Sequence, residues 1–360
     1  MKLTKFFALA LAAFAFVGCG GETPEQGVKP SGDAVLAANN NSVEVNTPIE
    51  FTVTAADGTD LTAEAVIYDK SHDYVVVENP YTPTMDGDYE FYAVVGNIIT
   101  PSIKVNVVPT VPALPEDAQP ENTLFNHRIL LVDHTGNTCG YCPKMMEALK
   151  EVAETGDYHS KYYEAMAHTY SSGDPAYSGA ANVVSSHHGV NAYPTLTYNF
   201  YHSTTSSYNA AHIIGQIDAL WKAEGADAGI AAAATLASTS VIVNTEVKAA
   251  VANDYRITAW LLEDGIYAKQ TNATAEWMNT HDNAIRQRVT SDDITGVDLG
   301  AIAAGETKST ALTLKIVGNK WARENLKVMV IVSAKNEKGK YEVANVAICP
   351  MNDVVTYDYK

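Results

Sequence analysis

The feature that most constrains the fold of this chain is the pair Cys139 and Cys142, which stand in the sequence Cys-Gly-Tyr-Cys. The pair follows an apolar run, 129–132, that is typical of a buried strand. It precedes residues 143–152, in which apolar side chains recur at helical spacing. A strand, a dithiol and a helix in this order predict that the cysteines lie at the start of the helix. So close a pair closes too short a loop to stabilise a fold, which favours a chemical role.

A helix start changes the chemistry of a thiol. Backbone N–H groups at a helix N-terminus stabilise a thiolate on the first cysteine and lower its pKa. A thiolate attacks a disulfide to give a mixed disulfide, which the second cysteine resolves. We therefore expect Cys139 to be the nucleophile and Cys142, one turn inside the helix, to be the shielded resolving thiol. Gly140 and Tyr141 are expected to contact the substrate and to tune the reduction potential.

Two alternatives to redox chemistry remain for the pair. A single Cys-x-x-Cys is half of a zinc site, but the sequence contains no second such pair and no suitably spaced pair of histidines. A structural pair without redox activity is the other alternative. We expect no metal and no cofactor at this site.

Two further positions fit the pattern of thioredoxin-like proteins. Tyr193-Pro194 directly precedes the apolar strand 195–198 and resembles the loop that carries a cis-proline opposite the dithiol. There, the backbone of the residue before the proline can pair with a substrate chain. Asp133 lies six residues before Cys139, an offset at which thioredoxin has a buried acid that assists proton transfer from the resolving cysteine. An ordinary strand-initiating proline and a solvated aspartate are the alternatives.

The beginning of the chain predicts export. Lys2 and Lys5 precede the apolar run 6–17, which is too short to span a bilayer and is typical of a signal peptide over residues 1–18. The run ends at Cys19 in a context that resembles the lipobox of bacterial lipoproteins. In such proteins the cysteine becomes the diacylated N-terminus, and acyl chains such as palmitate hold it at a membrane. A plain secretory signal is the alternative.

The remaining sequence divides into segments of different pattern. A polar tether, 19–32, is followed by short alternating strands over 33–108 that predict an immunoglobulin-like β-sandwich. A proline-rich linker, 109–121, separates these from 122–225, where strands alternate with helices as in an α/β fold. The helices are expected over 143–152, 180–187 and 210–224. Residues 226–360 return to strands and predict a second β-sandwich. The fold class is therefore multidomain, with a thioredoxin-like α/β domain between two all-β domains.

Single residues in the β segments carry further predictions. Tyr89 resembles the tyrosine corner of immunoglobulin-like folds, and Phe91 stands where antibody domains have a cysteine, so we expect no disulfide between the sheets. Cys349, in the apolar run 343–349, is expected to be a buried small hydrophobic residue.

The sequence leaves more than one role possible for several polar residues outside the dithiol. His187 and His188, together with Asp174, form either a metal site or capping and solvated groups. His281 and Arg286 are expected to be polar residues that set the fold of the C-terminal strands.

Charge excludes one class of partner. The chain carries 42 acidic and 24 basic side chains, a formal net charge of −18. Nucleic-acid binding requires a basic footprint, so we expect no nucleic-acid partner.

Several short motifs together resemble a lipoprotein family of Bacteroidetes that is named after a 28-kilodalton outer membrane protein. The resemblance covers roughly residues 122–350 and rests on segments 135–143, 167–168, 173–175, 193–195, 263–266 and 281–286. It implies association with the outer membrane, a thioredoxin-like domain and a β-sandwich. It does not imply a substrate.

Two functions follow from these observations. The first is thiol–disulfide exchange, as reductase or isomerase, on exported proteins through mixed disulfides, at an outer membrane to which Cys19 anchors the chain. The second is a cell-envelope binding or adhesion lipoprotein in which the thioredoxin fold is a non-catalytic scaffold.

Overall fold

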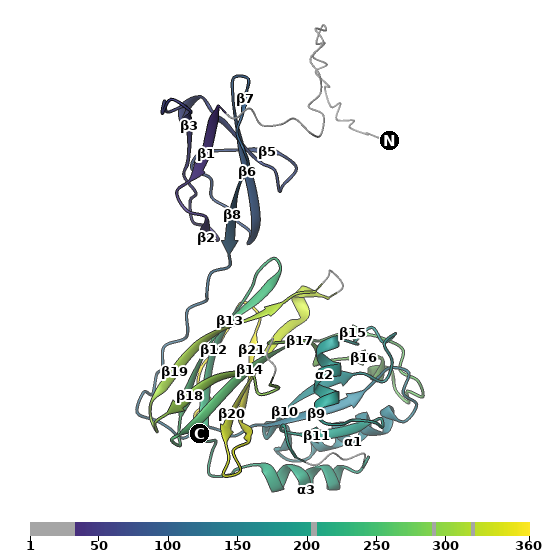
Figure 1. The fold of residues 1–360 in the computed structure, drawn as a ribbon. Coiled ribbons are helices and arrows are strands. Elements are labelled where there is room, and N and C mark those ends of the chain that lie inside the picture. The colour runs from purple at the N-terminus through teal and green to yellow at the C-terminus, as the bar shows by residue number, and fades with distance from the viewer. Residues whose placement is uncertain (1–32, 203–206, 290–292, 318–320) are drawn as a thin grey trace, which may run out of the picture. The chain divides into compact units, whose positions relative to one another are not determined.

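The structure is a computed structural model that describes residues 33–202, 207–289, 293–317 and 321–360. The predicted signal peptide, the tether and the lipidated Cys19 lie outside the described residues. Three α-helices are found in the part that the structure describes, and most other regular elements are strands (Figure 1). Contacts divide the chain into two compact units, the first of which contains the described residues of 1–41, 49–81 and 89–105.

The strands at the front of the chain form a β-sandwich. They are β1 (Ala34–Ala38), β2 (Ser42–Glu44), β3 (Phe51–Ala55), β4 (Val66–Asp69), β5 (Val75–Val77), β6 (Gly87–Val95), β7 (Ile98–Ile99) and β8 (Ile103–Val108). β1 pairs with β3, and the others form a sheet in the order β2-β8-β6-β4-β5 with β7 on β6. Phe51 of β3 packs on the fully buried Phe91 of β6, with ring centroids 4.8 Å apart. An aromatic contact thus joins the two sheets where antibody domains have a disulfide.

The second unit is built on one large sheet and one smaller sheet. The strands of the large sheet run in the order β11-β9-β10-β17-β14-β20-β21, and β18 pairs with β14 (Figure 1). Their bounds are β9 (Ile129–Thr135), β10 (Tyr162–His168), β11 (Thr195–Tyr198), β14 (Asn253–Glu263), β17 (Ala284–Arg288), β18 (Val297–Ile302), β20 (Leu326–Lys335) and β21 (Tyr341–Pro350). The smaller sheet has the order β19-β13-β12-β22, with β12 (Ala228–Leu236), β13 (Ser240–Ala249), β19 (Thr307–Lys315) and β22 (Val354–Val355). β15 (Ile266–Tyr267) and β16 (Thr280–His281) form a separate pair.

Helices cover both faces of β9, and all seven of its residues are therefore buried. α1 (Cys142–Glu154) and α3 (Ala210–Leu220) pack on the face that carries Leu131, whereas α2 (Gly179–His187) packs on the face that carries Leu130. β9 and β10 are parallel, and β11 runs antiparallel to β9. This arrangement places the carboxyl end of β9 beside the start of α1 and of β11.

The helices lie where the apolar spacing predicts them, with one difference in length. The pattern predicts a helix over 210–224, but α3 ends at Leu220 because the backbone of Trp221 is extended. The indole N–H of Trp221 donates to the carbonyl of His127, 3.0 Å away, and this contact fixes the turn out of the helix.

One sheet crosses the predicted boundary between residues 225 and 226. β10 pairs in parallel with β17, where Met166 lies opposite Ala284. The C-terminal part of this sheet packs against the smaller sheet, and residues such as Leu261, Val330, Val243 and Leu312 share the core between them. The C-terminal strands therefore form a β-sandwich, one sheet of which continues into the α/β region.

The proline-rich linker packs along β13. The carbonyl of Pro112 accepts a hydrogen bond from the side-chain amide of Asn244, 2.9 Å away. The ammonium of the buried Lys248 lies 3.0 Å from the carboxylate of Asp117 and also donates to the carbonyl of Pro120. A buried cation needs such acceptors, so this lysine fixes the end of the linker to the sandwich.

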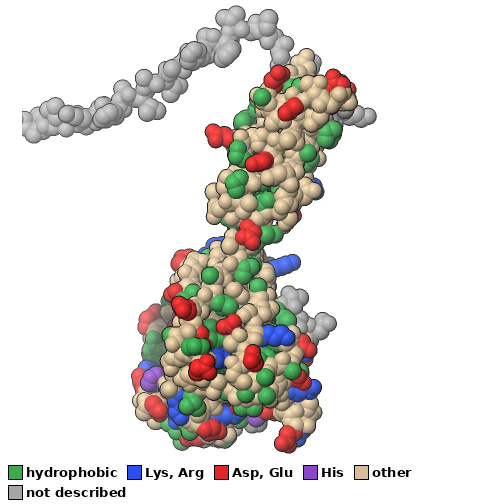
Figure 2. All heavy atoms as spheres, turned by 90° about the vertical axis from the view of Figure 1, so that its left-hand side faces the viewer, with side chains coloured by type: hydrophobic (Ala, Val, Ile, Leu, Met, Phe, Trp, Pro, Cys, Tyr) green, Lys and Arg blue, Asp and Glu red, His purple; other side chains and the backbone are tan. Residues whose placement is uncertain are grey.

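Figure 2 shows acidic and basic side chains interspersed with small groups of apolar ones over the drawn face of the second unit. Charge of both signs on one face is typical of a solvated protein surface. No helix among the described residues is long and apolar enough to cross a membrane.

Candidate functional site

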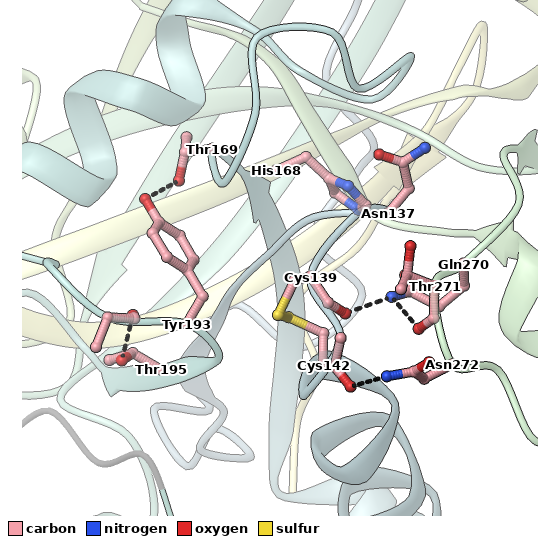
Figure 3. Close-up of a disulfide and its surroundings, with 12 residues drawn as sticks. Asn137, Cys139, Cys142, His168, Thr169, Tyr193, Thr195, Gln270, Thr271 and Asn272 are labelled. Atoms are coloured by element: carbon pink, nitrogen blue, oxygen red, sulfur yellow. Dashed lines mark hydrogen bonds between the residues drawn. A yellow bond between two sulfur atoms is a disulfide. The ribbon is translucent and has the colours of Figure 1, made fainter.

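The two cysteines of the Cys-Gly-Tyr-Cys sequence form a disulfide at the start of α1 (Figure 3). Their sulfur atoms are 2.16 Å apart and their Cα atoms 5.5 Å apart. α1 begins at Cys142, so Cys139 lies just before the first helical turn. Cys142 is fully buried, and only 2% of Cys139 is exposed, so the shielding expected of Cys142 extends to Cys139 in the disulfide form. Between them, Tyr141 is 62% exposed.

The loop before β11 lies on one side of the disulfide. The Tyr193-Pro194 peptide bond is cis, and Pro194 directly precedes β11. Thr195 pairs with His134 of β9, which places the loop next to the strand that leads to the dithiol. In Figure 3, Tyr193 and Thr195 lie to one side of the disulfide and Gln270, Thr271 and Asn272 to the other.

A chain of hydrogen bonds connects Tyr193 to the interior of the α/β region. The hydroxyl of Tyr193 lies 3.1 Å from that of Thr169, which lies 2.9 Å from that of Ser185 on α2. The hydroxyl of Ser185 lies 2.8 Å from Nδ1 of His134, and Nε2 of His134 lies 3.0 Å from the hydroxyl of Thr197. Burial lowers the pKa of His134 to about 3, so this network contains a neutral imidazole. This network of hydrogen bonds fixes the position of the Tyr193 side chain through its hydroxyl group.

Asp133 is a buried carboxyl group on β9. Neither of its oxygens has a hydrogen-bond partner, and the residue has no exposed surface. Burial, with a smaller contribution from the nearby Glu164, raises the pKa of Asp133 well above its ordinary value of 3.8. Because side chains alternate along a strand, Asp133 faces the same side as Leu131, where α1 begins with Cys142. The structure thus buries this aspartate on the face of the dithiol helix.

Glu164 of β10 lies beside Leu131 of β9, on the same face of the sheet as Asp133. It lines a cavity of about 380 Å³ together with Met146 and Lys150 of α1. Burial, and then the negative charge of Asp282, raise the pKa of Glu164 to about 7. Two carboxyl groups on neighbouring strands therefore both favour the protonated form more than free side chains do.

Asp174 holds the loop that leads from β9 to the dithiol. Its carboxylate accepts hydrogen bonds from Nδ1 of His168, 2.8 Å away, and from the backbone N–H of Asn137, 2.7 Å away. Burial alone would raise its pKa, but these bonds and that from Ala176 outweigh burial and lower the pKa to about 2. The ring of His281 stacks edge-on against that of His168 at 4.8 Å. These residues are an anchor for the loop.

The other polar residues singled out by sequence are held by protein groups. Nε2 of His187 lies 3.0 Å from the carbonyl of Phe200, and the ring of His188 lies 5.1 Å from that of His187. Arg286 forms a buried ion pair with Glu263 and donates to the carbonyl of Pro175. Within the described ranges, no group of three or more His, Cys, Asp or Glu side chains is arranged to hold a metal ion.

Cys349 lies apart from the dithiol. It is fully buried in β21, as expected from its apolar surroundings in the sequence. Burial raises the pKa of its thiol to about 11, which makes the thiolate scarce at neutral pH.

A segment from the C-terminal half of the chain contacts the dithiol loop, and the sequence carries no local signal for this contact. The side-chain amide of Gln270 donates to the carbonyl of Cys139 (2.9 Å), and that of Asn272 donates to the carbonyl of Gly140 (3.1 Å). The backbone N–H of Thr271 donates to the carbonyl of Asn137 (2.7 Å). Three successive residues therefore hold the backbone around the disulfide (Figure 3).

A cleft opens between this segment and the first turn of α1. Its volume is about 480 Å³, and it is lined by Gly140, Tyr141, Pro143, Lys144, Glu147, Asn272 and Thr274. The ammonium of Lys144 lies 5.4 Å from the ring centre of Tyr141 and 5.9 Å from that of Tyr208. An aromatic and cationic surface thus borders the dithiol.

Comparison with known proteins decides the family of the C-terminal half. Residues 181–352 match the family model described as outer membrane protein Omp28. This segment belongs to the Omp28 family. The match confirms the family that the motifs resemble and assigns the protein to the outer membrane. The Omp28 segment begins within α2 and includes Gln270 and Asn272, whereas the dithiol precedes it.

Solved structures give a likeness of fold beyond the Omp28 segment. HBP35 of Porphyromonas gingivalis has 16% sequence identity and a TM-score of 0.52, covering 64% of this chain and 77% of that chain. At this identity the likeness concerns the fold alone. Domains 4–9 of the surface layer protein SbsC, at 10% identity over 89% of this chain and 51% of that chain, have a TM-score of 0.19, too low for any argument. The search of curated proteins found no match.

Proposed function

We propose that this protein is a lipid-anchored outer-membrane protein that exchanges thiols and disulfides with exported proteins through Cys139 and Cys142. The observation that carries the proposal is the disulfide at the start of α1, with the cis Tyr193-Pro194 loop on one side of it. The parallel strands β9 and β10, the antiparallel β11 and helices on both faces support a thioredoxin-like domain in this part of the chain.

The exchange proceeds in two displacements. In the reductive direction, the Cys139 thiolate attacks one sulfur of a substrate disulfide, forms a mixed disulfide and releases the other substrate sulfur as a thiolate. Cys142, as thiolate, then attacks the sulfur of Cys139, which closes the protein disulfide and releases the second substrate thiol. Two electrons pass to the substrate. An exported or membrane-bound dithiol protein must return them before the next cycle.

Asp133 supplies the base for the second displacement. Cys142 is buried and reacts only after losing its proton, and Asp133 lies on the same face of the sheet without a hydrogen-bond partner. A carboxylate whose pKa is raised by burial accepts a proton more readily near neutral pH than a solvated one does. Asp133 therefore takes the proton from Cys142 as Cys142 attacks.

The substrate lies along the cis-proline loop. The backbone of Tyr193 offers pairing groups to an extended chain, and Gly140 and the exposed Tyr141 border the same disulfide. Backbone pairing accepts many sequences, which suits exchange with exported proteins of varied structure.

Insulin reduction tests the exchange activity. We expect the mature protein to accelerate dithiothreitol-driven reduction of insulin, Cys139→Ser to abolish the acceleration, and the matched control Cys349→Ala to retain it. The acceleration should come from the dithiol because Cys349 is buried and its thiol pKa is raised. A wild-type protein that leaves the insulin rate unchanged would contradict the proposal.

Mixed-disulfide trapping tests the order of attack. In Cys142→Ser the first displacement still occurs but the resolving thiol is absent, so substrate proteins should accumulate as reducible adducts on Cys139. Cys139→Ser should trap none. Equal trapping by both variants would show that Cys142 also attacks and would reject the assigned order.

The lipid anchor is a separate proposal with its own test. Cys19→Ser removes the acyl acceptor, so the protein should move from the membrane fraction to the soluble fraction and lose labelling by radioactive palmitate. Retention in the membrane after this substitution would reject the anchor.

A second function, that of an envelope binding protein with a non-catalytic scaffold, is favoured by the burial of Cys139, which is only 2% exposed. In that case neither insulin reduction nor adduct formation would be detected. Pull-down of the same envelope partners by wild type and by a Cys139→Ser/Cys142→Ser double variant would support it.

A further inference from the structure

Residues 268–274, here termed the strap, connect β15 to the short turn before β16 and contact the dithiol loop. Gln270 is buried, and its backbone N–H donates to the side chain of Asn279, 2.9 Å away. Its side-chain amide donates to the carbonyl of Cys139. Gln270 therefore links the C-terminal part of the chain directly to the proposed nucleophile.

Asn272 provides a second contact between the strap and the dithiol loop. Its backbone has φ of 59°, a left-handed conformation that asparagine and glycine adopt most readily. Its side-chain amide donates to the carbonyl of Gly140, and a Cβ on Gly140 would lie only 3.0 Å from that amide nitrogen. A side chain at position 140 would therefore press on the Asn272 amide and displace it slightly.

The far end of the strap is fastened to α1. The hydroxyl of Thr274 donates to the carboxylate of Glu147, 2.7 Å away. With the backbone contact from Thr271 to Asn137, the strap contacts the loop before the dithiol, the dithiol itself and the helix after it. On the opposite side lies the cis-proline loop (Figure 3).

We propose that the strap is a built-in cover of the redox site, in which Gln270 and Asn272 position the Cys139-Gly140 backbone and restrict access to the sulfur of Cys139. The proposal rests on the proposed function only in treating Cys139 as the reacting thiol. The bonds from Gln270 and Asn272 go to the backbone carbonyls of the dithiol loop and not to sulfur, so the cover persists when the disulfide is reduced. Gln270 and Asn272 are positioning residues because they act through the backbone of the dithiol loop.

The unpartnered side-chain oxygen of Gln270 favours movement of the strap away from the dithiol loop. The side-chain oxygen of Gln270 is buried without a hydrogen-bond partner. An unpartnered buried acceptor destabilises the closed arrangement and gains a water partner when the strap lifts. Most strap residues, among them Lys269, Thr271 and Asn272, are exposed on their outer side, so lifting the strap exposes little apolar surface.

The rate of Cys139 alkylation measures this cover without any substrate. The experiment uses the reduced mature protein carrying Cys142→Ser and Cys349→Ala, treated with iodoacetamide, and modification of Cys139 is followed by peptide mass spectrometry. Gln270→Met keeps the side-chain volume but removes the donor. Asn272→Gly keeps the left-handed backbone but removes the amide. Lys269→Ala, an exposed neighbour on the strap, is the control.

We expect the double variant Gln270→Met/Asn272→Gly to react about tenfold faster than its parent, a factor that corresponds to about 1.4 kcal/mol. Rates are taken over a range of pH, so that a change in the thiol pKa is separated from a change in the limiting rate at high pH. The alkylation rate of Lys269→Ala should remain within about twofold of the parent rate. This substitution changes the strap but keeps the two hydrogen bonds from Gln270 and Asn272 that we expect to limit the reaction.

A limiting rate for the double variant within about twofold of the parent would overturn the proposal. If far-UV circular dichroism shows that Gln270→Met does not fold, Asn272→Gly alone decides, with an expected increase of about threefold. Insulin reduction is measured in parallel on proteins with both cysteines. If the wild-type protein does not reduce insulin while the double variant is alkylated faster, the proposed function is refuted and the cover is not. If the wild-type protein reduces insulin while the alkylation rate of the double variant is unchanged, the cover alone is refuted.

Discussion

The hydroxyl groups of Tyr193 and Thr169 lie 3.1 Å apart, and through this contact the residue before the cis-proline is tied to the end of β10. Thr169 also contacts Ser185 of α2, so the loop that borders the dithiol is fixed to the opposite face of the sheet. The loop is thus oriented by groups that never touch the disulfide.

Thr169→Val keeps the shape of the side chain but removes the hydroxyl that joins Tyr193 to Ser185. We expect the free energy of unfolding to fall by about 1–2 kcal/mol, because two hydroxyl partners lose a hydrogen bond. In insulin reduction, KM should rise while kcat changes little. Thr169→Ser, which restores the hydroxyl, should restore KM, and a Ser variant as impaired as the Val variant would show that the methyl group matters instead.

Asp133→Asn tests the buried carboxyl through the pH dependence of stability. The pKa of Asp133 is raised on folding, so the folded state binds more protons than the unfolded state. Its contribution to stability is complete below its ordinary pKa of 3.8 and is lost as pH rises through the folded pKa. Asparagine does not titrate, so the variant should gain stability relative to wild type as pH rises above 3.8 and through the raised pKa of the folded state. Urea unfolding curves that shift in parallel at every pH would refute the raised pKa.

Gly136→Ala tests how closely the loop before the dithiol packs. A Cβ on Gly136 would lie 2.6 Å from Cβ of Tyr170 and 3.4 Å from a carboxylate oxygen of Asp174. Because the first contact is with an atom attached to the backbone, rotation cannot relieve it, and we expect a loss of about 1–3 kcal/mol in unfolding free energy. Insulin reduction should fall as well.

Gly179→Ala is the matched control for this change. A Cβ there meets nothing within 4 Å, and the residue opens α2, so alanine should be neutral or stabilise by up to about 1 kcal/mol. Thermal unfolding compares the melting temperatures of Gly136→Ala and Gly179→Ala. Equal melting temperatures would mean that the loop before the dithiol can accommodate a Cβ without loss of stability.

Arg286→Met tests the ion pair that holds β17 to β14. Arg286 and Glu263 are each 5% exposed, and Arg286 also donates to the carbonyl of Pro175, 2.9 Å away. Removing the cation leaves a buried carboxylate uncompensated, which costs about 3–5 kcal/mol in urea unfolding. Adding Glu263→Gln removes that charge and should recover more than half of the loss. No recovery in the double variant would assign the effect to packing alone.

The sequence patterns predicted those parts of the site that depend on neighbours along the chain. A strand followed by two cysteines and a helix is a local pattern, as is an X-Pro step before a strand. The offset of Asp133 from Cys139 leaves open a buried acid or a solvated aspartate, and the structure places this residue in the interior. Phe91 in place of a cysteine predicted only that no disulfide joins the sheets there, and its contact with Phe51 is a finding of the structure.

Contacts between distant parts of the chain were not predictable in this way. Gln270 and Asn272 lie in a turn-rich stretch with no apolar period, and nothing local marks them as partners of Cys139 and Gly140. The same holds for the burial of Cys139 and for the pairing of β10 with β17, since a parallel neighbour leaves no signature in either strand. Roles proposed for Cys139, Cys142, Asp133 and Tyr193 remain predictions for the experiments above.

The pairing of Met166 with Ala284 also has a consequence for biogenesis. While the chain emerges on the far side of the inner membrane, β9, β10 and β11 emerge before β17, so one edge of β10 has no neighbour until β17 follows. An unpaired edge strand recruits other chains. During that interval the edge of β10 is open to pairing with other chains, so a transcript truncated between α3 and β17 should yield aggregates rather than a smaller working domain.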